Sequence, residues 1–71
     1  MKLLDKNIEN IKWHVDYNES KVREVNTLLS MYRANEKFEK QVADLEWQLK
    51  HHQEALEDNV LILTALENLK P

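Results

Sequence analysis

The segment LSMYRANEKFEKQV, residues 29–42, decides the fold of this chain. Before it, apolar residues recur in alternating steps of four and three, which is the heptad spacing of a helix that packs along one stripe. The same spacing resumes after it, but the step from Tyr32 to Phe38 is six residues where seven would keep the register. The hydrophobic stripe is therefore interrupted once, at the middle of the chain.

The stripe has the same number of members on each side of the break. The first half consists of Leu4, Ile8, Ile11, Val15, Asn18, Val22, Val25, Leu29 and Tyr32. The second half consists of Phe38, Val42, Leu45, Leu49, His52, Leu56, Asn59, Leu63 and Leu66. Folding the chain back near residue 35 brings together positions of the same heptad type, so that Val25 meets Leu45 and Asn18 meets His52. The sequence therefore predicts an all-α fold, an antiparallel helical hairpin of the coiled-coil type.

The predicted hairpin is a single domain over residues 1–71. We expect a first helix over about 3–34, a turn over about 33–37 and a second helix over about 36–69. Asn35 is suited either to end the first helix in a left-handed conformation or to cap the start of the second.

One unbroken helix of about 105 Å, at 1.5 Å per residue, is the alternative. The six-residue step would then be a local over-winding of a parallel coiled coil. Three observations favour the hairpin: the two stripes have equal numbers of layers, the break lies at the midpoint, and the polar positions nearly coincide across the fold.

The composition limits how the fold is stabilised. The chain contains no cysteine and no glycine, and its one proline is Pro71, so no strong helix breaker lies in its interior and no disulfide can form. A core of this size supplies only about 3–5 kcal/mol, so association with another chain is expected to add stability. We expect a homodimer in which two hairpins form a four-helix bundle.

The charge pattern bears on partners and location. The net charge is −3, and residues 1–34 carry six basic and five acidic side chains while residues 35–71 carry four and eight. No basic stripe is present, which argues against nucleic acid as the main partner. No apolar run approaches the ~20 residues of a membrane span, and the first residues lack the apolar region of a signal peptide. We therefore expect no membrane contact and a cytoplasmic location.

Polar residues interrupt the predicted seam at two levels. Asn18 opposite His52 forms one polar layer, and Asn59 opposite Ile11 forms a second intrusion. Buried polar residues at such positions fix register and oligomeric state at a cost in stability. A pH-responsive role for His52, or a ligand site, is the alternative.

The outer aromatic residues do not belong to the seam. Trp13 and Tyr17 are four residues apart on the side of the first helix away from the seam, and Trp47 occupies the corresponding outer position of the second helix. Exposed aromatic residues that cluster mark contact surfaces. We expect Trp13, Tyr17 and Trp47 either to bind a partner protein or to pack in a symmetric dimer.

The open end of the hairpin is predicted to be strongly apolar. The second helix is hydrophobic on all sides over residues 60–63, and such a helix must be covered from more than one direction. We therefore expect self-association there, through a set of apolar residues from both ends of the chain: Leu3, Leu4, Ile8, Ile11, Val60, Leu61, Ile62 and Leu69.

Catalytic and metal-binding motifs are lacking. His14, His51 and His52, with Glu54 or Asp58 nearby, do not have the spacing of a metal site. There is no cysteine nucleophile and no glycine-rich phosphate loop. We expect no enzyme activity, no metal and no cofactor.

The function predicted from these residues is that of a small protein-interaction module, which binds a larger protein as an inhibitor, adaptor or regulator. A purely structural oligomerisation or scaffolding element is the alternative. The length and expected architecture are also similar to those of the Rop family of plasmid copy-number regulators, whose dimeric hairpins form a four-helix bundle. That similarity of size and topology implies RNA binding, for which Lys6, Lys12, Lys21 and Arg23 are the available cations.

Overall fold

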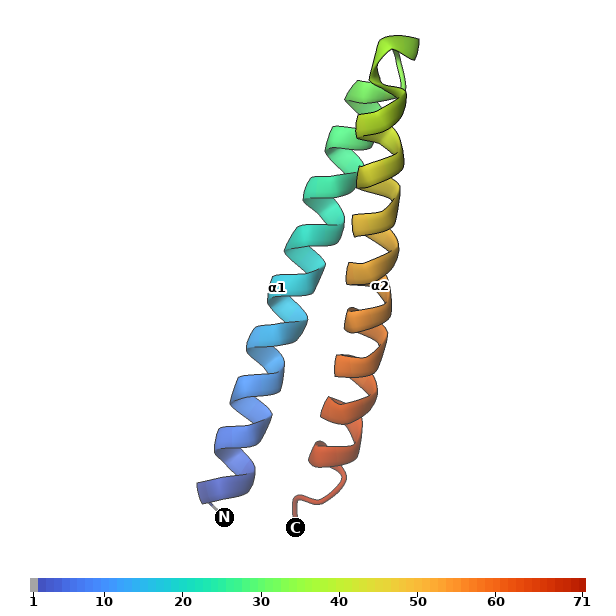
Figure 1. Ribbon diagram of the computed structural model, residues 1–71. Coiled ribbons are helices and arrows are strands. Elements are labelled where there is room, and N and C mark those ends of the chain that lie inside the picture. The colour runs from blue at the N-terminus through green and yellow to red at the C-terminus, as the bar shows by residue number, and fades with distance from the viewer. Residues whose placement is uncertain (1) are drawn as a thin grey trace.

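A computed structural model describes residues 2–71 as two long antiparallel helices (Figure 1). Helix α1 spans Lys2–Tyr32, a short 3-10 helix η1 spans Glu36–Phe38, and helix α2 spans Glu39–Glu67. The first residues of α1 and the last residues of the chain lie at the same end of the hairpin, opposite the turn, and the Cα atoms extend over 54 × 13 × 12 Å. The predicted reversal at mid-chain is confirmed, and the alternative of one unbroken helix is wrong.

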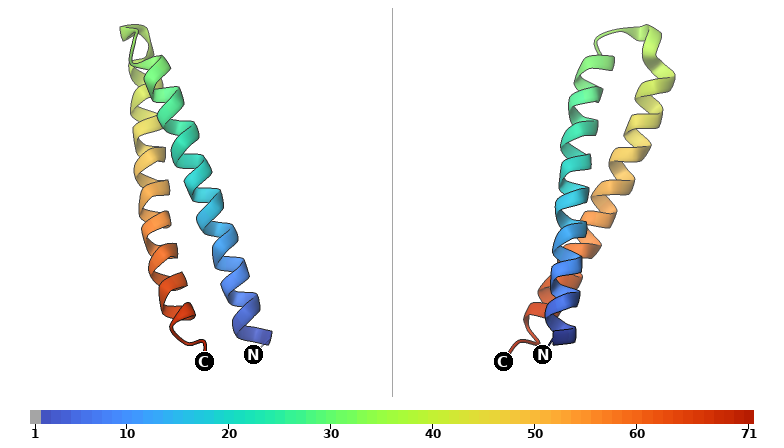
Figure 2. Two further views of the ribbon diagram at one scale, coloured as in Figure 1. Left: turned by 180° about the vertical axis from the view of Figure 1, so that it is seen from behind. Right: turned by 90° about the vertical axis from the view of Figure 1, so that its left-hand side faces the viewer.

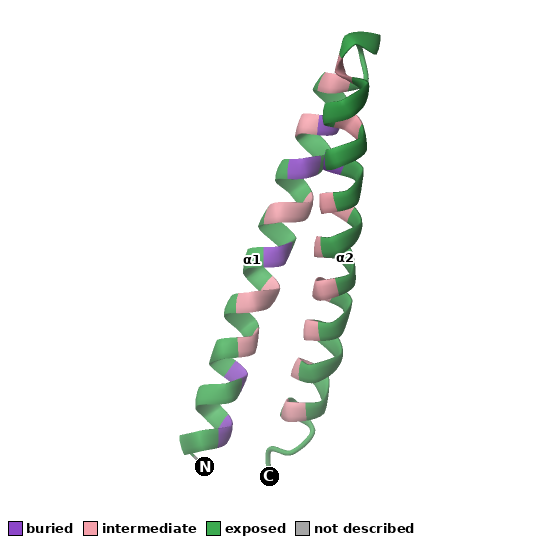
Figure 3. Cartoon of the chain, viewed as in Figure 1, coloured by how far each residue is buried: buried purple, intermediate pink, exposed green. Residues whose placement is uncertain are grey.

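The seam between the helices contains the predicted stripe. Every stripe residue is buried or half-buried, and Figure 3 shows that these residues face the neighbouring helix. The most buried group is Val25, Leu29 and Leu45, against which Val42 and Leu49 pack. Farther along α1, toward the open end, Leu4 and Ile8 are also buried. The core is thus one layer of side chains thick, and many of its members keep one side open.

The turn is longer than the sequence predicted. Helix α1 ends at Tyr32 rather than near residue 34, and regular α-helix resumes only at Glu39 rather than near residue 36. The rings of Tyr32 and Phe38 pack edge to face with centroids 5.0 Å apart, so the chain reverses its direction over the residues between them. A 3-10 helix fits this space because it rises faster per residue than an α-helix.

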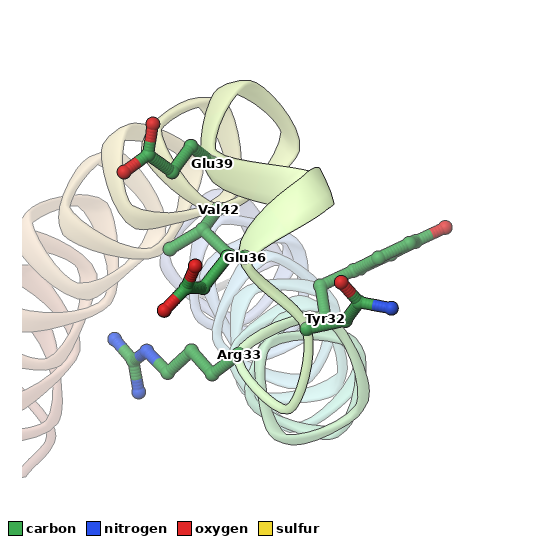
Figure 4. Close-up of a pocket in the computed structure, with 6 residues that line it drawn as sticks. Tyr32, Arg33, Glu36, Glu39 and Val42 are labelled. Carbon is green, nitrogen blue, oxygen red and sulfur yellow. The ribbon is translucent and has the colours of Figure 1, made fainter.

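Asn35 begins the second half of the hairpin as an N-cap. Its backbone is extended, with φ −140° and ψ 125°, and its side-chain oxygen accepts a hydrogen bond from the Lys37 backbone N–H at 3.0 Å. The left-handed alternative at this residue is therefore excluded. Beside it, Arg33 and Glu36 extend to one side of the turn and Tyr32 to the other (Figure 4).

The helices remain neighbours along their length, as the two further views show (Figure 2). On one side of the pair the guanidinium of Arg33 lies 3.5 Å from the carboxylate of Glu46, which links α1 to α2 near the turn. Both side chains are more than half exposed, so this ion pair contributes little to stability. The seam, and not the surface charges, holds the hairpin together.

The substitution Leu29→Ala should lower the free energy of unfolding by about 3 kcal/mol, because it leaves a cavity at a side chain that is 1% exposed. The same substitution at Leu61, which is 70% exposed, should change it by less than about 0.5 kcal/mol. Urea denaturation followed by circular dichroism, at one fixed protein concentration, measures both. Equal losses would show that Leu29 is not the centre of the core.

The substitution Asn35→Ala should cost about 1 kcal/mol, because it leaves the Lys37 N–H at the start of η1 without its acceptor. Asn35→Asp keeps an acceptor in the same place and should retain most of the stability. The same denaturation measurement compares the two variants. If they are equally unstable, the side-chain cap is not what stabilises the turn.

Candidate functional site

Two exposed aromatic rings form a stack on the outer side of α1. Trp13 and Tyr17 have ring centroids 5.7 Å apart and an interplanar angle of 11°. Their side chains meet because residues four apart are neighbours on one face of a helix. Trp13 is 62% exposed, and His14 packs against its ring edge to face at 5.3 Å. The Lys21 ammonium lies 5.7 Å from the Tyr17 ring, on the turn of helix that follows.

The stack on α1 continues across the seam onto α2. The Tyr17 ring packs edge to face against His52 with centroids 6.2 Å apart, and His52 packs against His51 at 5.8 Å. His51 in turn stacks on Trp47 at 5.4 Å with an interplanar angle of 4°. We call this row the aromatic belt; its members are Trp13, Tyr17, His52, His51 and Trp47. Trp47, at the far end of the belt, is 65% exposed.

The aromatic belt brings together residues that the sequence analysis did not predict to be in contact. The sequence identifies Trp13, Tyr17 and Trp47 as outer aromatic residues, but it draws attention to His51 only as a metal ligand whose spacing does not fit. The link passes through His52, whose ring belongs to the seam yet reaches Tyr17 on the outside of the neighbouring helix. Tyr17 and His51 are the sequence neighbours of Asn18 and His52, which the predicted hairpin pairs with each other. The same pairing therefore contains the information that Tyr17 and His51 lie close to one another.

The predicted polar layer is present at the middle of the seam. The Asn18 side chain is buried, and its Oδ1 atom lies 3.0 Å from Nδ1 of His52. Its amide nitrogen donates to the backbone carbonyl of His14 at 3.1 Å. Because a carbonyl only accepts, this second bond orients the amide and leaves Oδ1 facing the imidazole. The Nδ1 atom of His52 must then carry a proton and donate it to Asn18.

This geometry bears on the pH-responsive role considered for His52. Protonation adds a proton at Nε2 and leaves the Nδ1–H group unchanged, so the bond to Asn18 exists in the neutral and the charged ring. The layer therefore favours one register of the two helices in both protonation states. The other expected intrusion, Asn59, is half-buried in α2.

Of the apolar residues at the open end, some are buried within the hairpin and the others are exposed. Leu4 and Ile8 are buried and Ile11 is half-buried, so the hairpin already covers these three. The other residues proposed for self-association have exposed side chains: Leu3, Val60, Leu61, Ile62 and Leu69. On the outer side of α2 a shallow apolar hollow lies between Leu56, Glu57, Val60 and Leu61.

In the part of the chain that the structure describes, no three histidine, cysteine, aspartate or glutamate side chains are close enough to share a metal ion. A second hollow, lined by Trp47, Lys50, His51 and Glu54, adjoins one end of the aromatic belt. No helix among residues 2–71 combines the length and the hydrophobicity that crossing a bilayer requires.

Comparisons of the chain with family models, with curated proteins and with solved structures found no match.

Removing the polar layer by Asn18→Ala should lower the free energy of unfolding by about 1–3 kcal/mol, because the Nδ1–H group of His52 loses its acceptor in a half-buried position. Asn10→Ala removes the same side chain from an exposed position of the same helix and serves as the control. Urea denaturation measures both. Equal effects would mean that the bond to His52 adds nothing specific.

Proposed function

We propose that this chain is a small protein-interaction module that binds a larger protein through Trp13, Tyr17 and Trp47. The observation that carries the proposal is the aromatic belt, in which exposed rings from both helices are joined into one surface. Aromatic side chains supply much of the energy of protein interfaces because they bury a large area at a small cost in conformational entropy. Bound in this way, the module acts as an inhibitor, adaptor or regulator by occupying a site on its partner.

The belt is suited to this role because it is held in place before a partner binds. Trp13 and Tyr17 support each other by stacking, as do Trp47 and His51. His52 is in turn held by Asn18 within the seam. Rings that are already ordered lose less freedom on binding, and this lowers the cost of association.

Self-association is the second part of the proposal. The seam of the hairpin is half-covered at most of its positions, and apolar side chains are exposed at the open end. Two hairpins that form a coiled-coil-type four-helix bundle would cover both. If all exposed apolar residues are used in this way, the chain is a structural oligomerisation element instead.

RNA binding finds less support in the contacts of the cations. Lys21 pairs with Glu24 at 3.2 Å, and the Arg23 guanidinium lies 3.5 Å from the Ser20 hydroxyl on the same helix. Lys6 and Lys12 alternate along α1 with Asp5 and Glu9. Phosphate binding requires a surface on which positive charge predominates.

The double substitution Trp13→Ala with Tyr17→Ala should abolish partner binding and leave the helical content unchanged, because both rings are exposed and neither belongs to the seam. Binding is measured in cells that naturally produce the chain, with a photo-crosslinking amino acid in place of His51, inside the belt. Placed at Thr27, on the outer side of α1, the same amino acid serves as the control.

The expected result is an adduct with another protein from position 51, absent from position 27 and lost when Trp13 and Tyr17 are alanine. Adducts that contain only this chain would instead assign the belt to self-association. Adducts of equal yield from both positions would show that the belt has no special role.

A further inference from the structure

The hairpin has two long edges, one on each side of the seam, and contacts identify which residues lie on each. Tyr17 reaches His52 on one side, and Arg33 reaches Glu46 on the other. The heptad positions of the two helices that flank the seam on the Tyr17 side define the belt edge, which consists of Asn7, His14, Lys21, Leu28, Gln41, Gln48, Ala55 and Ile62. The positions on the Arg33 side define the charged edge, which consists of Asp5, Lys12, Glu19, Asn26, Arg33, Glu39, Glu46, Gln53, Val60 and Glu67.

The two edges differ in charge and in burial. All ten residues of the charged edge are exposed, and seven of them are charged; the other three are Asn26, Gln53 and Val60. Among the eight residues of the belt edge, Lys21 is the one Lys, Arg, Asp or Glu, and it pairs with Glu24. Five of these eight are already half-buried, and the exposed ones are Asn7, Gln41 and Ile62. Charged residues are depleted where protein surfaces are buried by association, so the belt edge has the composition of an interface and the charged edge does not.

Exposed apolar side chains extend the belt edge over the length of the hairpin. Leu3 and Leu69 lie beside it at the open end, and Met31 lies beside it near the turn. The aromatic belt crosses the edge near the middle of both helices. Residues that dominate binding energy are usually found at the centre of an interface, within a rim of weaker contacts.

We propose that a second copy of this chain covers the belt edge, with the two turns at the same end and α1 of each copy beside α2 of the other. This rests on the self-association in the proposed function and adds its location. The surface that holds the belt is then shared, so the second copy and the larger partner bind one at a time. In the homodimer the aromatic belt is covered, so the homodimer must dissociate before the larger partner can bind.

Charge and hydrophobicity determine the orientation. Residues 1–34 carry six basic and five acidic side chains, and residues 35–71 carry four and eight. Turns at the same end put the more basic helix of one copy beside the acidic helix of the other, which is complementary. Turns at opposite ends would place α2 beside α2, with acid against acid. The same-end arrangement also brings Leu3, Ile62 and Leu69 of both copies together in one apolar cluster.

Two adjacent residues of α2 provide a matched pair of variants. Ile62 is 46% exposed on the belt edge, whereas Leu61 is 70% exposed and points about 100° away around the helix. Ile62→Glu should weaken dimerisation by at least about tenfold, measured by sedimentation equilibrium, because each interface then buries new carboxylates. Leu61 was among the residues expected to self-associate, but in this arrangement it lies outside the interface. Leu61→Glu should therefore leave the dimerisation constant within about twofold of wild type. Circular dichroism confirms that both variants stay helical.

The proposal is overturned if the unmodified chain is a monomer, if Leu61→Glu weakens the dimer as much as Ile62→Glu, or if neither variant weakens it. A spin label tests the orientation, because the chain has no cysteine and Lys37→Cys adds a single one at the turn. A distance between labels far below the 54 Å length of the hairpin supports turns at the same end. A distance near that length shows opposite turns and refutes the arrangement.

Exclusive binding is tested on the purified complex with the crosslinked partner. Native mass spectrometry should find one copy of this chain for each partner, and two copies would refute the shared surface. These outcomes are separate from those of the proposed function. If crosslinks form only between copies of this chain, and Ile62→Glu disrupts them, the proposed partner binding is refuted and the dimer is supported. If crosslinks form only to another protein, and the chain does not dimerise, the dimer is refuted and partner binding is supported.

Discussion

The hydrogen bond between Asn18 and His52 fixes the alignment on which the other features depend. The remaining layers of the seam are largely aliphatic, and aliphatic layers tolerate sliding because one is much like the next. A shift of the helices by one heptad would place His52 opposite Val25 or Ile11 and leave Nδ1 without an acceptor. The same shift would part Tyr17 from His52 and interrupt the aromatic belt. One polar contact therefore aligns both the core and the surface.

The hairpin could be predicted because its determinants are local in the sequence. The out-of-register step between Tyr32 and Phe38 and the heptad numbering sufficed to pair Asn18 with His52. The helix ends were less predictable, since nothing in the composition of residues 33–38 prohibits an α-helix. The packing of the Tyr32 and Phe38 rings, and the cap that Asn35 provides, shorten the helices at the turn. Those are tertiary effects, which heptad spacing does not report.

The sequence predicted the exposed aromatic residues of the candidate site but not the contacts between them. The exposure of Trp13, Tyr17 and Trp47 follows from their heptad positions. The contacts that join these three residues into one belt do not follow from heptad positions. They require His52 to reach Tyr17 on the outer side of α1 and His51 to stack on Trp47. The difference between the two edges was also missed, since it emerges only when the flanking positions of both helices are compared side by side.

The first residues of α1 and the last residues of the chain lie at one end of the hairpin, opposite the turn. If two copies lie side by side with their turns together, the C-terminal end of one is close to the N-terminal end of the next. A short flexible peptide would then suffice to join two copies in tandem, because the required span is a small fraction of the length of the hairpin. The hairpin is in this sense one half of a single-chain bundle, which gene duplication and fusion would produce without any change of topology.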